Sequence, residues 1–255
     1  MELGDDTPRR REVASAPCSI ALCVLLTACA ASPSYPPAAP GTGNRQAPAE
    51  RDFKLADVAK SDVDLVTEVN VRECLASARL LMEKLYRRNP REWRKGGFAS
   101  MDAALARAFD PRLRFAFAEL SGAQGTEAIV LALRPDYAGD RVFAFGVGLA
   151  SMVFVAYGGK TVFYLTDTLD PQKLYNSARN VEIAAWKLAN ARDARGELLI
   201  LSNEMAGDVP NLSFEREFGK MIAYQDLMAQ IAAQRTNRTI RRVVQGIATA
   251  VFLPI

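Results

Sequence analysis

The chain has 255 residues, of which 49% are hydrophobic and 24% are charged, and its formal net charge is +3. This length suits one large domain or two small ones, and the charge is too low for a nucleic-acid-binding domain, so we expect no nucleic-acid partner. The sequence has no histidine, which excludes Ser-His-Asp catalysis, Cys-His catalysis and histidine-ligated zinc; we expect no metal site.

Residues 1–28 have the layout of a secretory signal peptide. Arg9, Arg10 and Arg11 come first, an apolar run extends from Ile20 to Leu26, and small residues lead up to Cys29. The apolar run is too short to cross a bilayer as a helix. The acids among the first six residues depart from this pattern, because signal peptides rarely begin with acidic residues. We expect residues 1–28 to be removed.

The tetrapeptide Leu26-Thr27-Ala28-Cys29 resembles the lipobox of bacterial lipoproteins. The resemblance covers residues 1–29 alone, and it implies that Cys29 is acylated on sulfur and becomes the mature N-terminus. In that family, an aspartate directly after the cysteine favours retention at the inner membrane. Ala30 stands there in this chain, so the resemblance implies the periplasmic face of the outer membrane. The alternative is an ordinary signal peptide followed by a cysteine without a role.

Residues 29–51 are predicted to form an extended spacer after the acylated cysteine. This stretch has few large apolar side chains, so it cannot bury enough surface to offset the entropy of ordering it. Its prolines keep it extended; they are Pro33, Pro36, Pro37, Pro40 and Pro48. We therefore divide the chain into a signal peptide (1–28), a lipidated spacer (29–51) and a mostly helical periplasmic domain (52–255).

Apolar residues at steps of three and four predict a helix after Ser61, with its buried stripe running from Val71 to Leu85. Asn89-Pro90 marks the end of this helix, because the residue before a proline resists the α conformation. Cys74 lies on the stripe and is predicted to be a buried, unreactive thiol without a disulfide partner. Shorter helices are expected over Met101–Phe109, after Ser100 as N-cap, and over Gly125–Leu133.

The uncharged segment 142–159 admits three interpretations. It is rich in glycine and long enough for a tilted transmembrane helix, and its small residues recur four apart, which permits close helix packing. We favour a central helix buried on all sides of a globular domain over a membrane-inserted helix or a pair of buried strands. Burial of these side chains within the domain would exclude the membrane-inserted helix.

The remaining elements are also expected to be mainly helical. Residues 161–166 suggest a strand, and 198–201 either a short buried strand or a helical turn. A helix begins at Pro171 after the cap Asp170, and a long helix begins after Ser213. The apolar tail 243–253 is expected to dock on the core. The fold class is therefore mainly α, a single compact multi-helix domain with at most one or two short strands and a central glycine-rich buried helix.

One candidate surface for a ligand or partner lies beside the glycine-rich segment. Asp167 and Asp170 stand just before the helix expected from Pro171, and Arg179, Asn180 and Trp186 lie on it. Acids at a helix start usually serve as caps. The alternative is a buried polar network that holds two layers together.

A second candidate surface is basic and consists of Arg235, Arg238, Arg241 and Arg242. It is suited to contact with peptidoglycan or anionic lipid, and the alternative is a solvated face without a partner. No cofactor is expected. Gly146-Val147-Gly148 and Gly158-Gly159-Lys160-Thr161 lack the remaining glycines of the dinucleotide fingerprint and of the phosphate-binding loop.

We therefore expect an outer-membrane-anchored periplasmic lipoprotein that is a non-catalytic structural or interaction subunit of a cell-envelope assembly. The membrane is contacted through the acyl chains on Cys29, and a second envelope protein is the expected partner. One alternative is an envelope hydrolase with paired carboxylates drawn from Glu119, Glu127, Asp167, Asp170 and Glu182. The other is a membrane-inserting helical protein that uses residues 142–159.

Overall fold

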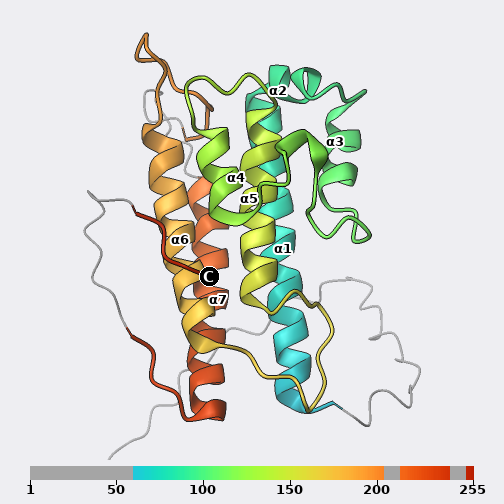
Figure 1. Cartoon of the computed structure of the whole chain (residues 1–255), viewed down its shortest axis with the longest axis vertical. Helices are drawn as coiled ribbons and strands as arrows, with labels where there is room; N and C mark the ends of the chain where they lie inside the picture. Colours follow the sequence, from blue (N-terminus) through green and yellow to red (C-terminus); the bar gives the residue numbers. More distant parts are fainter. Residues whose placement is uncertain (1–59, 204–212, 242–250) are drawn as a thin grey trace, which may run out of the picture. The chain divides into compact units, whose positions relative to one another are not determined.

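The computed structural model describes residues 60–203, 213–241 and 251–255. Over these ranges the chain forms seven α-helices and one short 3-10 helix, and its β-structure is limited to a single bridge between Arg192 and Leu198. The prediction of a mainly α fold is confirmed (Figure 1). The signal peptide, Cys29, the spacer and Arg242 lie outside the described residues.

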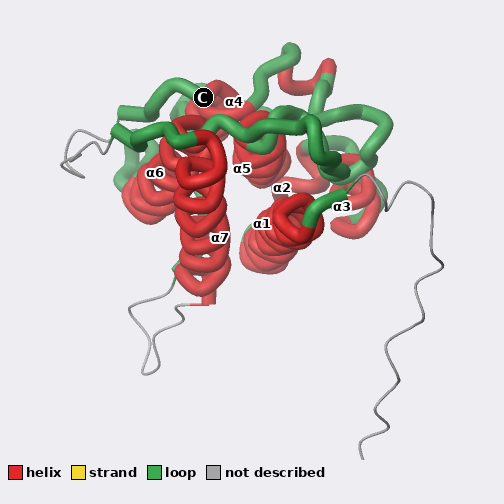
Figure 2. The backbone as a smooth tube through the Cα atoms, turned by 90° about the horizontal axis from the view of Figure 1, so that it is seen from below, coloured by secondary structure: helices red, strands yellow, loops and turns green. Residues whose placement is uncertain are grey.

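Four long helices carry most of the packing. They are α1 (Asp62–Arg88), α5 (Arg141–Ala156), α6 (Pro171–Asn190) and α7 (Ser213–Thr236). Helix α7 packs against both α1 and α6, and α5 packs against α1. Figure 2 shows α6 and α7 together on one side, and α1 with the short helices α2 (Pro90–Lys95) and α3 (Met101–Ala108) on the other.

Helix α1 begins at the predicted cap. Ser61 and Asp64 form a capping box, in which the Ser61 hydroxyl accepts the Asp64 backbone N–H and the Asp64 carboxylate accepts the Ser61 backbone N–H. Val71, Cys74, Ala78, Leu81 and Leu85 are buried along one stripe, as their spacing predicts. The predicted starts of α3 after Ser100 and of α6 after Asp170 are also confirmed.

Helix α5 is the predicted glycine-rich helix, and its side chains from Val142 to Val153 are buried within the domain. Its glycines lie where other elements approach most closely. An added Cβ at Gly146 would stand 2.5 Å from the Met82 sulfur, and one at Gly148 would stand 2.8 Å from the Gly125 carbonyl oxygen. The interpretation as paired strands is wrong, because Arg141–Ala156 forms one continuous helix. This helix packs against both α1 and α4 (Gly125–Ala132).

None of the helices among the described residues has both the length and the apolar character needed to cross a membrane.

Two local predictions differ from the structure. Residues 161–166 form no strand, because the Phe163 N–H is donated to the Glu68 carboxylate (2.9 Å) rather than to a neighbouring strand. Residues 198–201 form neither a strand nor a helical turn, since Leu198 makes only an isolated bridge to Arg192 while Ile200 fills the core.

Helix α2 is absent from the sequence predictions. Asn89-Pro90 ends α1, as predicted, but Pro90 also occupies the first turn of α2, where its missing N–H costs no hydrogen bond.

The end of the chain lies against α6. Leu253 and Pro254 make hydrogen bonds to side chains of that helix, and Phe252 and Ile255 pack against the core. The predicted docking of the tail is therefore confirmed for residues 251–255, while residues 242–250 lie outside the described part.

Candidate functional site

The two acids that precede α6 are engaged locally. Asp170 is the N-cap of α6, and its carboxylate accepts the Gln172 N–H at 2.9 Å. Asp167 accepts the Tyr164 N–H at 3.0 Å and pairs with Lys160. The Lys160 hydrogen bond holds the pKa of Asp167 below its ordinary value. Both acids therefore stabilise the turn that leads into α6.

Arg179 joins α6 to α7. Its guanidinium bonds Asp226 at 2.5 Å and Glu182 at 3.1 Å, and it lies over the Tyr175 ring, 5.2 Å from the centroid. This side chain is mostly covered, with 22% of its surface exposed. It acts as part of the packing between the two helices, which is the alternative that the sequence left open.

Asn180 and Trp186 have different surroundings. Asn180 is fully buried and bonds the backbone of Leu253, whereas Trp186 is 40% exposed near the end of α6. Asp170 and Trp186 are separated by roughly 24 Å of helix, at 1.5 Å per residue. The structure therefore does not bring the five predicted residues into one site; it spreads them along the length of α6.

The predicted basic surface is divided in a similar way. Arg235 donates to Asp64 at 3.1 Å and to the Leu165 carbonyl at 3.4 Å, so it links α7 to α1 and to the loop before α6. The side chains of Arg238 and Arg241 are exposed, and the Arg241 backbone bonds the Gln172 side chain. Two of the four arginines thus remain open to an anionic surface, and Arg242 lies outside the described residues.

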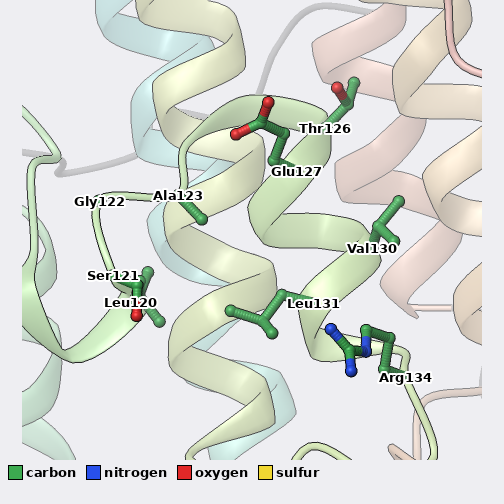
Figure 3. A pocket seen from close by; sticks show the side chains of 9 residues that line it. All are labelled: Leu120, Ser121, Gly122, Ala123, Thr126, Glu127, Val130, Leu131 and Arg134. Atoms are coloured by element: carbon green, nitrogen blue, oxygen red, sulfur yellow. The ribbon is translucent and has the colours of Figure 1, made fainter.

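A hollow of about 590 Å³ opens on the outer face of α4 (Figure 3). Glu127 and Arg134 stand at its two ends with Leu131 between them, and Val130 is 46% exposed. Arg134 is paired with Asp136. The sequence predictions do not include this hollow, although residues 128–133 are all apolar and a surface helix can bury only one face of such a run.

A second cavity of about 400 Å³ lies between the end of α5 and the loop after α3. Its apolar wall includes the rings of Phe109, Phe115 and Phe154. Arg114 and Phe115 both have left-handed backbone, with φ of 46° and 61°, which is uncommon for side chains of this size. The Arg114 guanidinium bonds the Gly159 carbonyl at 3.1 Å and covers the Phe154 ring, so this side chain ties the loop after α3 to the end of α5.

A buried polar cluster surrounds the start of α5. Asp140 caps the helix by accepting the Phe143 N–H at 2.8 Å, and it accepts the Tyr86 hydroxyl at 2.8 Å. Burial raises the pKa of Asp140 to about 6, and the nearby Glu92 adds to this effect. Glu92 accepts the Arg141 N–H at 2.8 Å. The cluster is enclosed by the protein, so it fixes helix ends rather than meeting a substrate.

The carboxylates considered for hydrolysis are mostly engaged. Glu119 pairs with Arg107 at 3.2 Å and Glu182 with Arg179 at 3.1 Å, while Asp167 and Asp170 hold the turn before α6. Glu127 is the single acid that lines the hollow on α4. Within residues 60–203, 213–241 and 251–255, no group of three or more acids and cysteines is arranged to hold a metal ion.

No family model, curated protein or solved structure matches this chain.

Proposed function

We propose that the protein is a lipoprotein on the periplasmic face of the outer membrane and serves as a non-catalytic interaction subunit of a cell-envelope assembly. The observation that carries this proposal is the tetrapeptide Leu26-Thr27-Ala28-Cys29 at the end of an apolar run, with Ala30 directly after it. Acylation at Cys29 tethers the helical domain to the membrane through the proline-rich spacer, and several acyl chains together make the anchor stable.

The arrangement of charged groups in the helical domain supports a binding role over a hydrolytic one. Hydrolysis by paired carboxylates needs two acids that face each other across an open cleft, roughly 5–9 Å apart. Of the acids considered, four are occupied by ion pairs or by the turn before α6, and Glu127 faces the hollow on α4 with Arg134 at the far end.

Helices α1 and α4 expose apolar side chains that a partner could contact. Val66 and Val69 are three residues apart on α1 and therefore adjacent, and they are 42% and 45% exposed. Val130 adds to the apolar surface beside the hollow on α4. Exposed apolar groups that lie together mark interaction sites more often than isolated ones do.

The anchor is tested by comparing the wild-type chain with Cys29→Ser in the native cell. We expect the wild-type protein to fractionate with the outer membrane, and its N-terminal peptide to carry acyl chains on residue 29 in mass spectra. Cys29→Ser should lose the acyl mass and leave the outer-membrane fraction. The matched control is Cys23→Ser, which leaves the lipobox intact and should remain acylated. An unmodified residue 29 in the wild-type protein would refute the anchor.

The assembly is tested separately by purifying the acylated protein from its own membranes in mild detergent. We expect a defined partner to co-purify in a fixed ratio, and the recovery of that partner to survive a wash in high salt. A protein recovered only as an isolated monomer contradicts the subunit role while leaving the anchor intact.

A further inference from the structure

Three amide side chains on α6 bind the backbone of the C-terminal part of the chain. They are spaced four residues apart, so they line one face of the helix. Asn180 accepts the Leu253 N–H at 2.6 Å and donates to the Leu253 carbonyl at 2.8 Å. Asn176 donates to the Pro254 carbonyl at 2.8 Å. Gln172 makes the same pair of bonds with the Arg241 backbone, at 2.8 and 3.1 Å.

These bonds recognise the main chain, which every peptide carries. Asn180 satisfies both the donor and the acceptor of one residue, as a neighbouring strand does in a sheet. Two side chains of residues 251–255 face the solvent: Val251 is 64% exposed, and Pro254 is also exposed. Phe252 lies beside the Lys187 ammonium, 5.6 Å from the ring centroid, and Ile255 packs against the core. The face therefore selects an extended backbone together with two apolar side chains.

We propose that this face of α6 is a docking site for an extended peptide of a partner protein, and that residues 251–255 are its resident occupant, which the partner displaces. The matching peptide has an aromatic residue beside Lys187, an extended residue paired with Asn180, and an apolar residue in the place of Ile255. The segment lies across α6 in Figure 1, as the peptide would. The inference rests on the proposed function only for the existence of a partner.

Displacement is a matter of competition between a tethered and a free ligand. A segment of the same chain competes as an intramolecular ligand, at an effective concentration on the order of millimolar. A free peptide with the same contacts therefore needs a similar concentration to replace the tail, whereas a partner that also contacts neighbouring surface competes at far lower concentration. The amides of Asn176 and Asn180 regain partners when the new peptide docks, so no buried polar group is left unsatisfied.

The test uses the full chain with Phe252→Ala and Leu253→Pro, which weakens the tail by removing the aromatic contact with Lys187 and the N–H that Asn180 accepts. The probe is a fluorescent peptide of sequence VFLPI, and the readout is anisotropy. We expect this opened chain to bind the probe at least tenfold more tightly than the wild-type chain does. Circular dichroism confirms that the helices are retained.

Two matched changes assign the binding to the amide face. Asn180→Ala in the opened chain should weaken probe binding at least tenfold, and so should N-methylation of the leucine in the probe. Asn190→Ala should leave it unchanged, because Asn190 is exposed on the same helix and donates to the Trp186 carbonyl of its own turn. An opened chain that keeps its helices and fails to bind the probe overturns the proposal.

A measurement on the unmodified chain covers the case in which the opened chain does not fold. Native-state hydrogen exchange should show the Leu253 amide exchanging at least a hundredfold faster than the amides in the middle of α6, and excess peptide should change its rate. Equal protection would make the tail a fixed part of the core and refute the inference. A wild-type dimer that the probe dissociates would identify a second copy as the occupant, which also refutes a partner peptide. Neither result bears on acylation at Cys29.

Discussion

Two glycines in α5 show how single residues set the approach of helices. At Gly146 the obstacle to a Cβ is the side chain of Met82, with its sulfur at 2.5 Å. At Gly148 the obstacles include backbone, namely the Gly125 oxygen and the Ile129 nitrogen, both at 2.8 Å. A methionine side chain can rotate away, whereas the backbone of a packed helix cannot. The two positions therefore differ in their tolerance of alanine.

We predict that Gly148→Ala lowers the free energy of unfolding by about 3 kcal/mol and Gly146→Ala by about 1 kcal/mol. The reference is Gly219→Ala in α7, where an added Cβ meets nothing within 4 Å. That change should stabilise the protein by about 0.5–1 kcal/mol, since alanine is the better helix former. Urea unfolding monitored by circular dichroism gives all three values. Equal effects at Gly148 and Gly219 would disprove the close approach of α4 to α5.

Asp140 makes stability depend on pH. Its pKa is about 6 in the folded chain, against 3.8 in the unfolded one. Between these values the folded state holds a proton that the unfolded chain has released, so stability falls as pH rises through this window, by about 3 kcal/mol in total. Asp140→Asn keeps an oxygen to cap Phe143 and should flatten the slope between pH 4 and 6. Urea midpoints across this range provide the check, and an unchanged slope would contradict it.

At the scale of elements, the start of α1 is tied to the end of α7. Asp64 is buried. Its carboxylate accepts hydrogen bonds from the backbone N–H and the hydroxyl of Ser61, and it pairs with Arg235 at 3.1 Å. Burial alone would raise the pKa of Asp64, but the bonds from Ser61 and Arg235 outweigh it and lower the pKa. One side chain thus serves as a cap for its own helix and as an anchor for another helix.

We predict that Asp64→Ala lowers stability by about 2–3 kcal/mol at pH 7, because it removes the capping box and leaves Arg235 without its carboxylate. A carboxyl with a lowered pKa contributes stability above its unfolded pKa of 3.8 and loses it as pH falls, so the deficit should shrink below pH 4. The control is Asp62→Ala in the same helical turn, where the side chain is exposed and the change should be small. Thermal unfolding at several pH values measures both.

At the scale of the whole molecule, the reactivity of Cys74 measures whether α1 and α7 separate. The thiol is fully buried and stands 4.0 Å from the Met221 carbonyl of α7. Burial raises its pKa to about 12, so the reactive thiolate is scarce at neutral pH. Within the described residues it is a free cysteine, as predicted.

We predict that an aromatic disulfide reagent labels Cys74 in the processed chain only as fast as the protein unfolds. Labelling should be fast in urea and slow in buffer, and Gly219→Ala should slow it further in proportion to its stabilisation. Cys74→Ser supplies the background signal. Fast labelling in buffer would show that α1 and α7 separate locally, which would contradict the tight packing seen between them.

Local signals were enough to predict most helices. The starts at Ser61, Ser100 and Asp170 follow from capping residues that act within a few residues of the helix they begin, and the buried stripe of α1 follows from its spacing. The helix α2 was missed because Pro90 can end one helix and also begin another, and the strand at 161–166 was wrong because Phe163 donates to the distant Glu68.

The sequence by itself determined the absence of histidine chemistry, the mainly helical fold and the resemblance of residues 1–29 to a lipoprotein signal. It favoured a buried glycine-rich helix over 142–159, and the packing of α5 decided between that helix and the strand alternative. The tertiary structure alone decided what the polar residues of α6 contact. Asn180 faces the tail and Arg179 faces α7, although they are neighbours in the chain. Such contacts join residues many positions apart, so they depend on how the helices pack. Periodicity and capping act over a few residues, so they do not predict contacts between distant parts of the chain.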